Sequence, residues 1–171
     1  MRPTSVKTLL SIGCLILVTG CASVPMESAD KNLKAKSFPT PDQGKSGLYV
    51  YRDSFVGKAL KKDVYLDGNC VGETADKVFF YTQVDGDHTY QLSTESEFSP
   101  NDLKLDVNAG KNYFVRQFIK MGVFVGGAGL ESVPEDEGKR VISKPDVNLA
   151  AMPGHCDHTS IKAAANAAAQ K

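Results

Sequence analysis

Between residues 47 and 119 the chain alternates short β-rich runs with turn signals, at the spacing of roughly 8–12 residues that is typical of all-β sandwiches and barrels. The runs lie at 48–52, 64–66, 70–71, 78–84, 88–93, 103–107 and 113–119. No helical pattern long enough to form a core interrupts them. We therefore predict one all-β domain over residues 47–144, an immunoglobulin-like sandwich of about seven strands.

Turn and helix signals refine this prediction. Asp67-Gly68 readily adopts the positive φ angles of a tight turn, which predicts a hairpin between residues 63 and 73. The run 113–119 is apolar on both faces and is therefore expected in the middle of a sheet. Residues 134–143 are expected to form a short helix, because three acidic residues near its start favour the helix dipole. The alanine-rich segment 160–170 has no apolar stripe, so a helix in the tail over 145–171 would be marginal.

The first twenty residues have the organisation of an export signal. Arg2 and Lys7 precede an apolar run at 9–18, which is about half the length of roughly 20 residues that a membrane-spanning helix needs. Small residues follow this run. We therefore interpret residues 1–20 as a signal peptide and not as a membrane span.

The end of this signal, Val18-Thr19-Gly20-Cys21, resembles the lipobox of bacterial lipoproteins. The resemblance implies cleavage between Gly20 and Cys21, attachment of a diacylglyceryl group to the Cys21 thiol and acylation of the new amino terminus. Two or more acyl chains hold a protein firmly at a bilayer, so the membrane is the first expected partner. Ala22 after the modified cysteine implies the outer membrane of a Gram-negative envelope, facing the periplasm. The alternative is an ordinary secretory signal that is cleaved near Ala22-Ser23.

Residues 21–46 have the composition of a flexible tether between the lipid and the domain. They contain three prolines, several Ser and Lys and few large apolar side chains. Phe38 is the one aromatic residue in this stretch, and we expect it to dock on the domain.

Removal of the signal changes the counts of cysteine and charge. Of four cysteines, Cys14 leaves and Cys21 is lipidated, so that Cys70 and Cys156 remain, and in an oxidising envelope they are expected to pair. Two free thiols are one alternative. The other is a metal site in the segment His155-Cys156-Asp157-His158, although neighbouring ligands do not easily converge on one ion.

The charge balance argues against a nucleic-acid partner. The whole chain carries 20 basic and 20 acidic residues, and the signal removes Arg2 and Lys7 but no acid. The 151 residues after position 20 therefore carry a net charge of −2. Such a chain gains no general drive from counterion release on binding nucleic acid.

Five segments of the β region, at 64–68, 71–74, 86–88, 103–107 and 110–113, recur in a recognisable order. Together they resemble the PEGA-type β-sandwich repeat of bacterial surface proteins. Asp85-Gly86-Asp87-His88 departs from the Pro-Gly-Glu-His that this family favours. Segments 47–52 and 121–127 are similar to a group of small bacterial lipoproteins with a domain of unknown function. The resemblance implies a sandwich fold and an envelope location, with no established activity or catalytic residues.

The glycine-rich segment 122–129 follows a β-rich run, as a phosphate-binding loop would. A dinucleotide fingerprint needs a helix directly after the glycines, whereas an extended piece at 130–133 follows here. We therefore interpret the segment as a closely packed strand connection. The apolar residues Val123, Phe124 and Val125 are the candidate for an exposed contact patch.

The sequence contains no recognisable arrangement of catalytic residues. His88 begins a strand after a turn, and Glu95 and Glu97 are expected on a solvated edge. No nucleophile stands in a recognisable motif with a base, so we expect no enzyme, no metal and no cofactor.

A binding role is the better hypothesis. We expect a lipid-anchored, non-enzymatic module that contacts another envelope protein or peptidoglycan. The alternative is a small-ligand or glycan-binding module that uses the tyrosines with Arg52 or Arg116. The tyrosines are Tyr49, Tyr51, Tyr65, Tyr81, Tyr90 and Tyr113.

Overall fold

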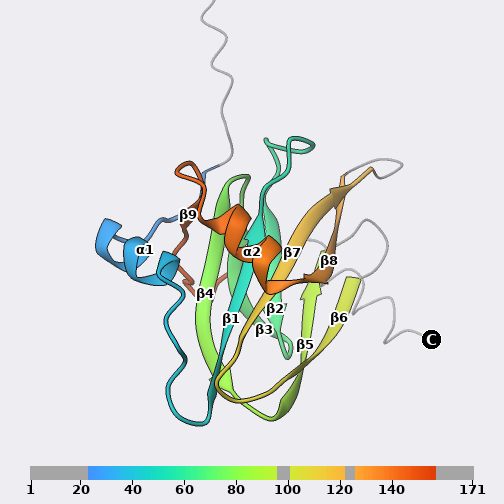
Figure 1. Ribbon diagram of the computed structural model, residues 1–171. Helices are drawn as coiled ribbons and strands as arrows, with labels where there is room; N and C mark the ends of the chain where they lie inside the picture. Colours follow the sequence, from blue (N-terminus) through green and yellow to red (C-terminus); the bar gives the residue numbers. More distant parts are fainter. Residues whose placement is uncertain (1–22, 96–100, 122–125, 157–171) are drawn as a thin grey trace, which may run out of the picture.

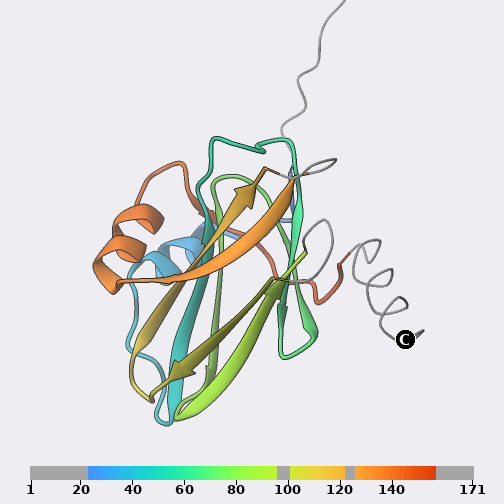
Figure 2. The same ribbon diagram turned by 90° about the vertical axis from the view of Figure 1, so that its right-hand side faces the viewer.

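The computed structural model describes residues 23–95, 101–121 and 126–156 of the chain, and they form two packed β-sheets with two short helices (Figures 1 and 2). A five-stranded sheet has the order β8-β7-β1-β4-β9, and a four-stranded sheet has the order β3-β2-β5-β6. The strands are β1 Lys45–Arg52, β2 Lys62–Leu66, β3 Asn69–Thr74, β4 Val78–Asp85, β5 His88–Thr94, β6 Asn101–Val107, β7 Asn112–Lys120, β8 Gly127–Val133 and β9 Asn148–Leu149, and the helices are α1 Ala29–Lys36 and α2 Glu135–Ile142. The predicted all-β sandwich is confirmed, with nine strands in the described residues against about seven expected.

The register of the strands defines two ends of the sandwich. Strand β1 is antiparallel to β4, with Arg52 opposite Val78, and parallel to β7, with Tyr51 opposite Arg116. The chain therefore leaves β1 and β7 at the same end, which we call the upper end and which lies at the top of Figure 1. The turn at 85–88 between β4 and β5 lies at the opposite, lower end.

Local sequence signals explain several of these elements. Asp67 and Gly68 both have positive φ and turn β2 into β3, as the hairpin prediction requires. Helix α2 confirms the helix predicted at 134–143. Strand β7 lies between β8 and β1, which confirms an interior position for the run at 113–119.

A polar side chain, Gln117, ties the two sheets together inside the main core. It comes from β7 and is fully buried among the apolar residues that fill the space between the sheets. Its Nε2 donates to Oγ1 of Thr94 on β5 at 2.7 Å, and its Oε1 accepts a hydrogen bond from Thr74 on β3. Both threonines belong to the four-stranded sheet, so these bonds fix how one sheet sits on the other.

A second core covers the outer face of the five-stranded sheet. Tyr49, Phe79 and Phe114 are buried there beneath the two helices, together with Ile142 of α2. The rings of Tyr49 and Phe114 are stacked with centroids 4.9 Å apart. The sheet is therefore buried on both faces over β1, and its tyrosines are core residues.

The structure corrects both predicted boundaries of the domain. Val24 is buried in the core, α1 lies against the sheet, and Phe38 docks on Tyr49 with ring centroids 5.6 Å apart. The flexible-tether prediction is therefore wrong for residues 24–46, although docking of Phe38 is confirmed. At the other end β9 pairs with β4 and Cys156 is buried, so residues 145–156 are part of the domain and not of a tail. The predicted helix at 160–170 lies outside the described residues.

Candidate functional site

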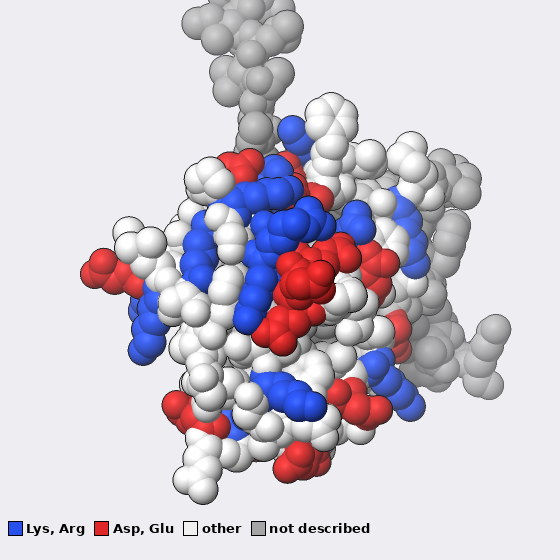
Figure 3. All heavy atoms as spheres, in the orientation of Figure 1, with Lys and Arg blue, Asp and Glu red and all other residues white. Residues whose placement is uncertain are grey.

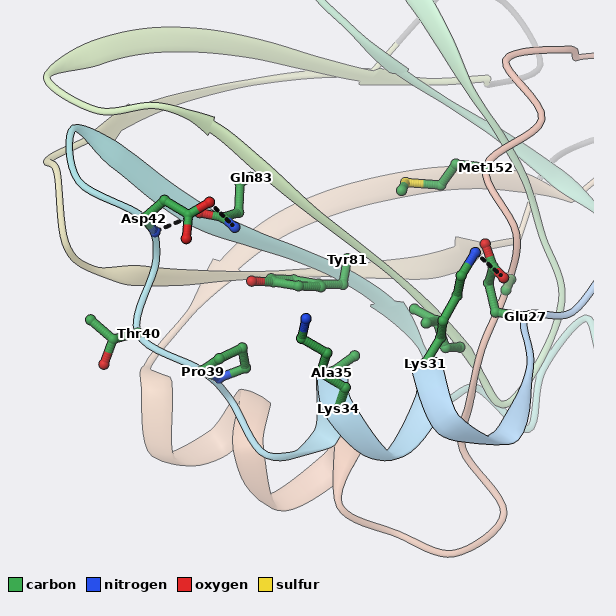
Figure 4. Close-up of a pocket in the computed structure, with 12 residues that line it drawn as sticks. Glu27, Lys31, Lys34, Ala35, Pro39, Thr40, Asp42, Tyr81, Gln83 and Met152 are labelled. Carbon is green, nitrogen blue, oxygen red and sulfur yellow. Dashed lines mark hydrogen bonds and ion pairs between the residues drawn. The ribbon is translucent and has the colours of Figure 1, made fainter.

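One concave feature of the described surface is a groove of about 400 Å³ between α1 and the outer face of β4 (Figure 4). We call it the α1–β4 groove. Three parts of the chain that lie far apart in sequence contribute to its walls. The lining residues are Glu27, Lys31, Lys34, Ala35, Pro39, Thr40, Asp42, Tyr81, Gln83, Leu149, Ala150 and Met152.

Tyr81 provides an aromatic surface in the middle of the groove (Figure 4). It lies opposite Tyr49 in the β1–β4 register, and the two rings are stacked at 4.5 Å. Tyr49 is itself fixed, because its hydroxyl donates to the backbone oxygen of Ala35 in α1 at 3.0 Å. Burial raises the pKa of the Tyr81 phenol, so its hydroxyl stays neutral and can donate a hydrogen bond.

The charged groups of the groove differ in whether they already have partners. Lys31 is paired with Glu27 at 2.9 Å. Gln83 donates to the Asp42 carboxylate at 3.1 Å and accepts from the Asp42 backbone N–H at 2.7 Å, which fixes the loop before β1. Lys34 forms no ion pair within the described residues, and Figure 4 shows its amine pointing from α1 toward Tyr81. The groove thus holds one uncommitted cation beside an aromatic ring.

These groups can contact a ligand in two ways. An aromatic face packs against the apolar face of a sugar ring, and a lysine ammonium binds a carboxylate. The lining residues include no histidine, serine or cysteine. The groove therefore fits a polar ligand that carries both a ring and a negative charge.

The two remaining cysteines form a disulfide. Cys70 at the start of β3 and Cys156 near the end of the described chain are bonded, with Cα atoms 6.0 Å apart. The predicted pairing is confirmed, and the alternatives of free thiols and of a metal site that includes the Cys156 thiol are wrong. Asp157 and His158, the other members of that alternative, lie outside the described residues.

The predicted arrangement of tyrosines with Arg52 or Arg116 is not assembled. Tyr49, Tyr51, Tyr65 and Tyr90 are buried. Arg52 is also fully buried, and Arg116 on β7 forms an ion pair with Glu131 at 3.0 Å. Of the six tyrosines, Tyr81 alone lines the α1–β4 groove, so the candidate site keeps one aromatic side chain from that prediction.

The other candidates lie apart from the groove. His88 is exposed at the lower end beside Tyr90, and Glu95 pairs with Lys62 at 3.3 Å. In the glycine-rich segment, residues 127–129 belong to strand β8 and not to a strand connection, and Gly129 lies close to the Phe118 and Lys120 side chains of β7. Residues 122–125 of this segment lie outside the described residues. Gly20, Cys21, Glu97 and the apolar run 123–125 lie outside the described residues.

The groove could not be predicted from the sequence, because α1 forms one of its walls. The sequence does contain a start signal for this helix, since Ser28 caps it through a bond from Lys31 N–H at 3.4 Å. Asp30 in the first turn and two lysines in the last turn also favour the helix dipole. That signal identifies the helix but not the strand against which it packs.

Fold and groove together define a β-sandwich module with a surface groove beside α1. The chain belongs to the family described as protein of unknown function DUF2846, whose model matches residues 42–128. It is also 56% identical over 134 residues to a Haemophilus influenzae protein described as uncharacterized. The aligned residues make up 78% of this chain and 79% of that protein. Neither helix in the described ranges is long and apolar enough to cross a membrane.

Proposed function

We propose that this protein is a lipid-anchored, non-enzymatic module of the bacterial envelope that binds peptidoglycan in the α1–β4 groove. The observation that carries the binding role is that the Lys34 amine, which has no ion pair within the described residues, points toward the Tyr81 ring in that groove. The lipobox-like sequence that ends at Cys21 supports the anchor, and the similarity to PEGA-type repeats supports an envelope location.

The chemistry of peptidoglycan matches this groove. Its strands are amino sugars, whose rings have apolar faces that stack on aromatic side chains. Its short peptides carry carboxylates, which a lysine ammonium binds through a charge-assisted hydrogen bond. A groove of about 400 Å³ is within the range of about 300–1,000 Å³ that is common for ligand sites, and it accommodates a short piece of such a polymer.

Two substitutions in the groove are expected to weaken binding to purified peptidoglycan. Lys34→Glu reverses the charge that faces the ligand, and Tyr81→Ala removes the aromatic surface. Each is expected to reduce binding at least roughly tenfold, since a desolvated charge contact or a lost aromatic contact is worth about 1.4 kcal/mol or more. The measurement is co-sedimentation of the protein with peptidoglycan sacculi over a range of concentrations.

Lys104→Glu is the matched control for this experiment. Lys104 is exposed on β6 in the other sheet. Lys104→Glu therefore changes the net charge of the protein by the same amount as Lys34→Glu but leaves the groove intact. Urea denaturation midpoints equal to that of the wild type exclude unfolding of a variant as the cause of weaker binding. Lys34→Glu is the cleaner of the two variants, because Tyr81→Ala also removes the stacking on Tyr49. Equal binding by wild type and Lys34→Glu, or no binding by wild type, contradicts the proposal.

The anchor has its own test. Cells that express the wild-type protein are expected to incorporate radiolabelled palmitate into it, whereas Cys21→Ala is expected to show no label and to leave the membrane fraction. Cys14→Ala is the control, because Cys14 lies within the apolar run of the signal. Label that persists in Cys21→Ala rules out lipidation at this residue and favours cleavage near Ala22-Ser23.

A further inference from the structure

Three large apolar side chains are exposed together at the upper end of the sandwich. Phe55 and Val56, in the loop after β1, are 84% and 48% exposed, and Met121 directly after β7 is 87% exposed. The two segments adjoin, because Gly57 lies against Ile119 and Gly126 against Leu60. We call Phe55, Val56 and Met121 the apical patch.

The loop that carries most of the apical patch is held in place by a buried arginine. Arg52 is fully buried, and its guanidinium donates to the backbone oxygens of Leu60, at 2.8 Å, and Gly57. The Ser54 hydroxyl donates to the Val56 oxygen at 2.9 Å, and the Ser54 backbone N–H donates to the Asp76 carboxylate at 2.8 Å. The exposed tip is therefore preorganised with its apolar side chains directed outward, which is costly in water and useful at an interface.

The apical patch lies at the end where the described chain begins. In Figures 1 and 2 the start of the chain, drawn in dark blue, is at the upper end beside the loop at 53–61. The described residues begin at Ser23, and Cys21 is two residues earlier. Two residues span at most about 7 Å, so a lipid on Cys21 brings the upper end close to the bilayer surface.

The charges around the apical patch suit a lipid surface. The Lys58 amine lies over the Phe55 ring, 4.6 Å from its centroid. The loop tip at 55–60 contains no acidic residue, and the Asp53 carboxylate below it is bonded by Lys77 and Lys144. Figure 3 shows uncharged atoms protruding at this end with a basic side chain beside them. Apolar and basic groups together are the composition of interfacial membrane contacts.

We propose that the apical patch rests on the bilayer, with the Phe55, Val56 and Met121 side chains in the boundary between headgroups and acyl chains. This inference rests on the proposed lipid anchor at Cys21. The patch fixes the upper end on the membrane, so that the domain does not rotate freely about its anchor. The α1–β4 groove, on the flank of the sandwich, then stays clear of the bilayer.

A single tryptophan tests this contact, since the chain contains none. The full lipidated protein with Phe55→Trp is reconstituted into vesicles of phosphatidylethanolamine and phosphatidylglycerol whose acyl chains are brominated near the headgroup. We expect a blue-shifted emission that the brominated lipid quenches roughly twofold or more, as for aromatic side chains in the interface. His88→Trp, exposed at the lower end, is the control and is expected to show neither change.

The outcomes separate this inference from the proposed anchor. Flotation of both variants with the vesicles tests the anchor alone. If both float and Phe55→Trp is quenched no more than His88→Trp, the apical contact is overturned while the anchor stands. If neither floats, the anchor fails and this inference fails with it. Emission of Phe55→Trp that shifts in native membranes but not in lipid vesicles also overturns it, in favour of a protein partner for the patch.

Discussion

Replacing both disulfide cysteines with alanine is expected to lower the free energy of unfolding by about 4 kcal/mol. The bond joins residues that are 86 positions apart, and closing so long a loop strongly restricts the unfolded chain. It also holds the segment after β9 across the sandwich, because Cys156 is buried and its Sγ lies 4.0 Å from the Val64 oxygen on β2. The measurement is urea denaturation of wild type and of the Cys70→Ala, Cys156→Ala double variant.

Reduction provides the control for this prediction. A reductant that opens the disulfide is expected to shift the wild-type midpoint nearly as far as the double variant, and to leave the double variant unchanged. A wild-type protein whose stability is the same with and without reductant contradicts the role given to the bond.

The second large effect is expected at Gly138 in α2. In an exposed helix, Gly→Ala stabilises by up to about 1 kcal/mol. Here a Cβ would fall into the Phe114 side chain on β7, 2.5 Å from its Cβ and closer still to two ring atoms. Gly138→Ala is therefore expected to destabilise the protein by about 2–3 kcal/mol, in the range measured for overpacked cores.

A double-mutant cycle identifies the cause of this loss. Phe114→Ala removes the two ring atoms nearest the new methyl group, so Gly138→Ala should cost clearly less in that background. The free energies of unfolding come from urea denaturation of the four proteins. Strict additivity of the two substitutions contradicts the packing explanation, as does any stabilisation by Gly138→Ala alone.

The strands are predictable because their signals are local. Alternating side chains and the Asp67-Gly68 turn act within a few residues, so the sandwich and its first hairpin follow from the sequence. Helix α1 carries its own cap but exposes most of its side chains and buries only Ala35. Composition alone therefore predicts a tether at residues 21–46, because the segment contains few large apolar residues. Composition does not show that Val24 and Phe38 pack against the domain.

The candidate site depends on contacts that no local pattern encodes. Tyr81 and Lys34 come together because α1 and β4 pack side by side, which is a property of the tertiary structure. Tyr49 and Tyr51 of β1 are buried beneath the helices, whereas Tyr81 of β4 is only partly buried. The sequence does not distinguish these tyrosines. Arg52 similarly has the chemistry of an anion site, but its side chain is fully buried and both of its terminal nitrogens donate to the backbone of its own loop.

The central claim is that peptidoglycan binds in the α1–β4 groove, and an NMR titration tests it most directly. Soluble peptidoglycan fragments are added to the full chain carrying Cys21→Ala, which has no lipid, while amide chemical shifts are followed. We predict saturable shifts at Lys34, Tyr81 and Gln83 and none at Lys104 on the opposite sheet. Saturable shifts confined to residues outside the groove, or no shifts at all, contradict the account.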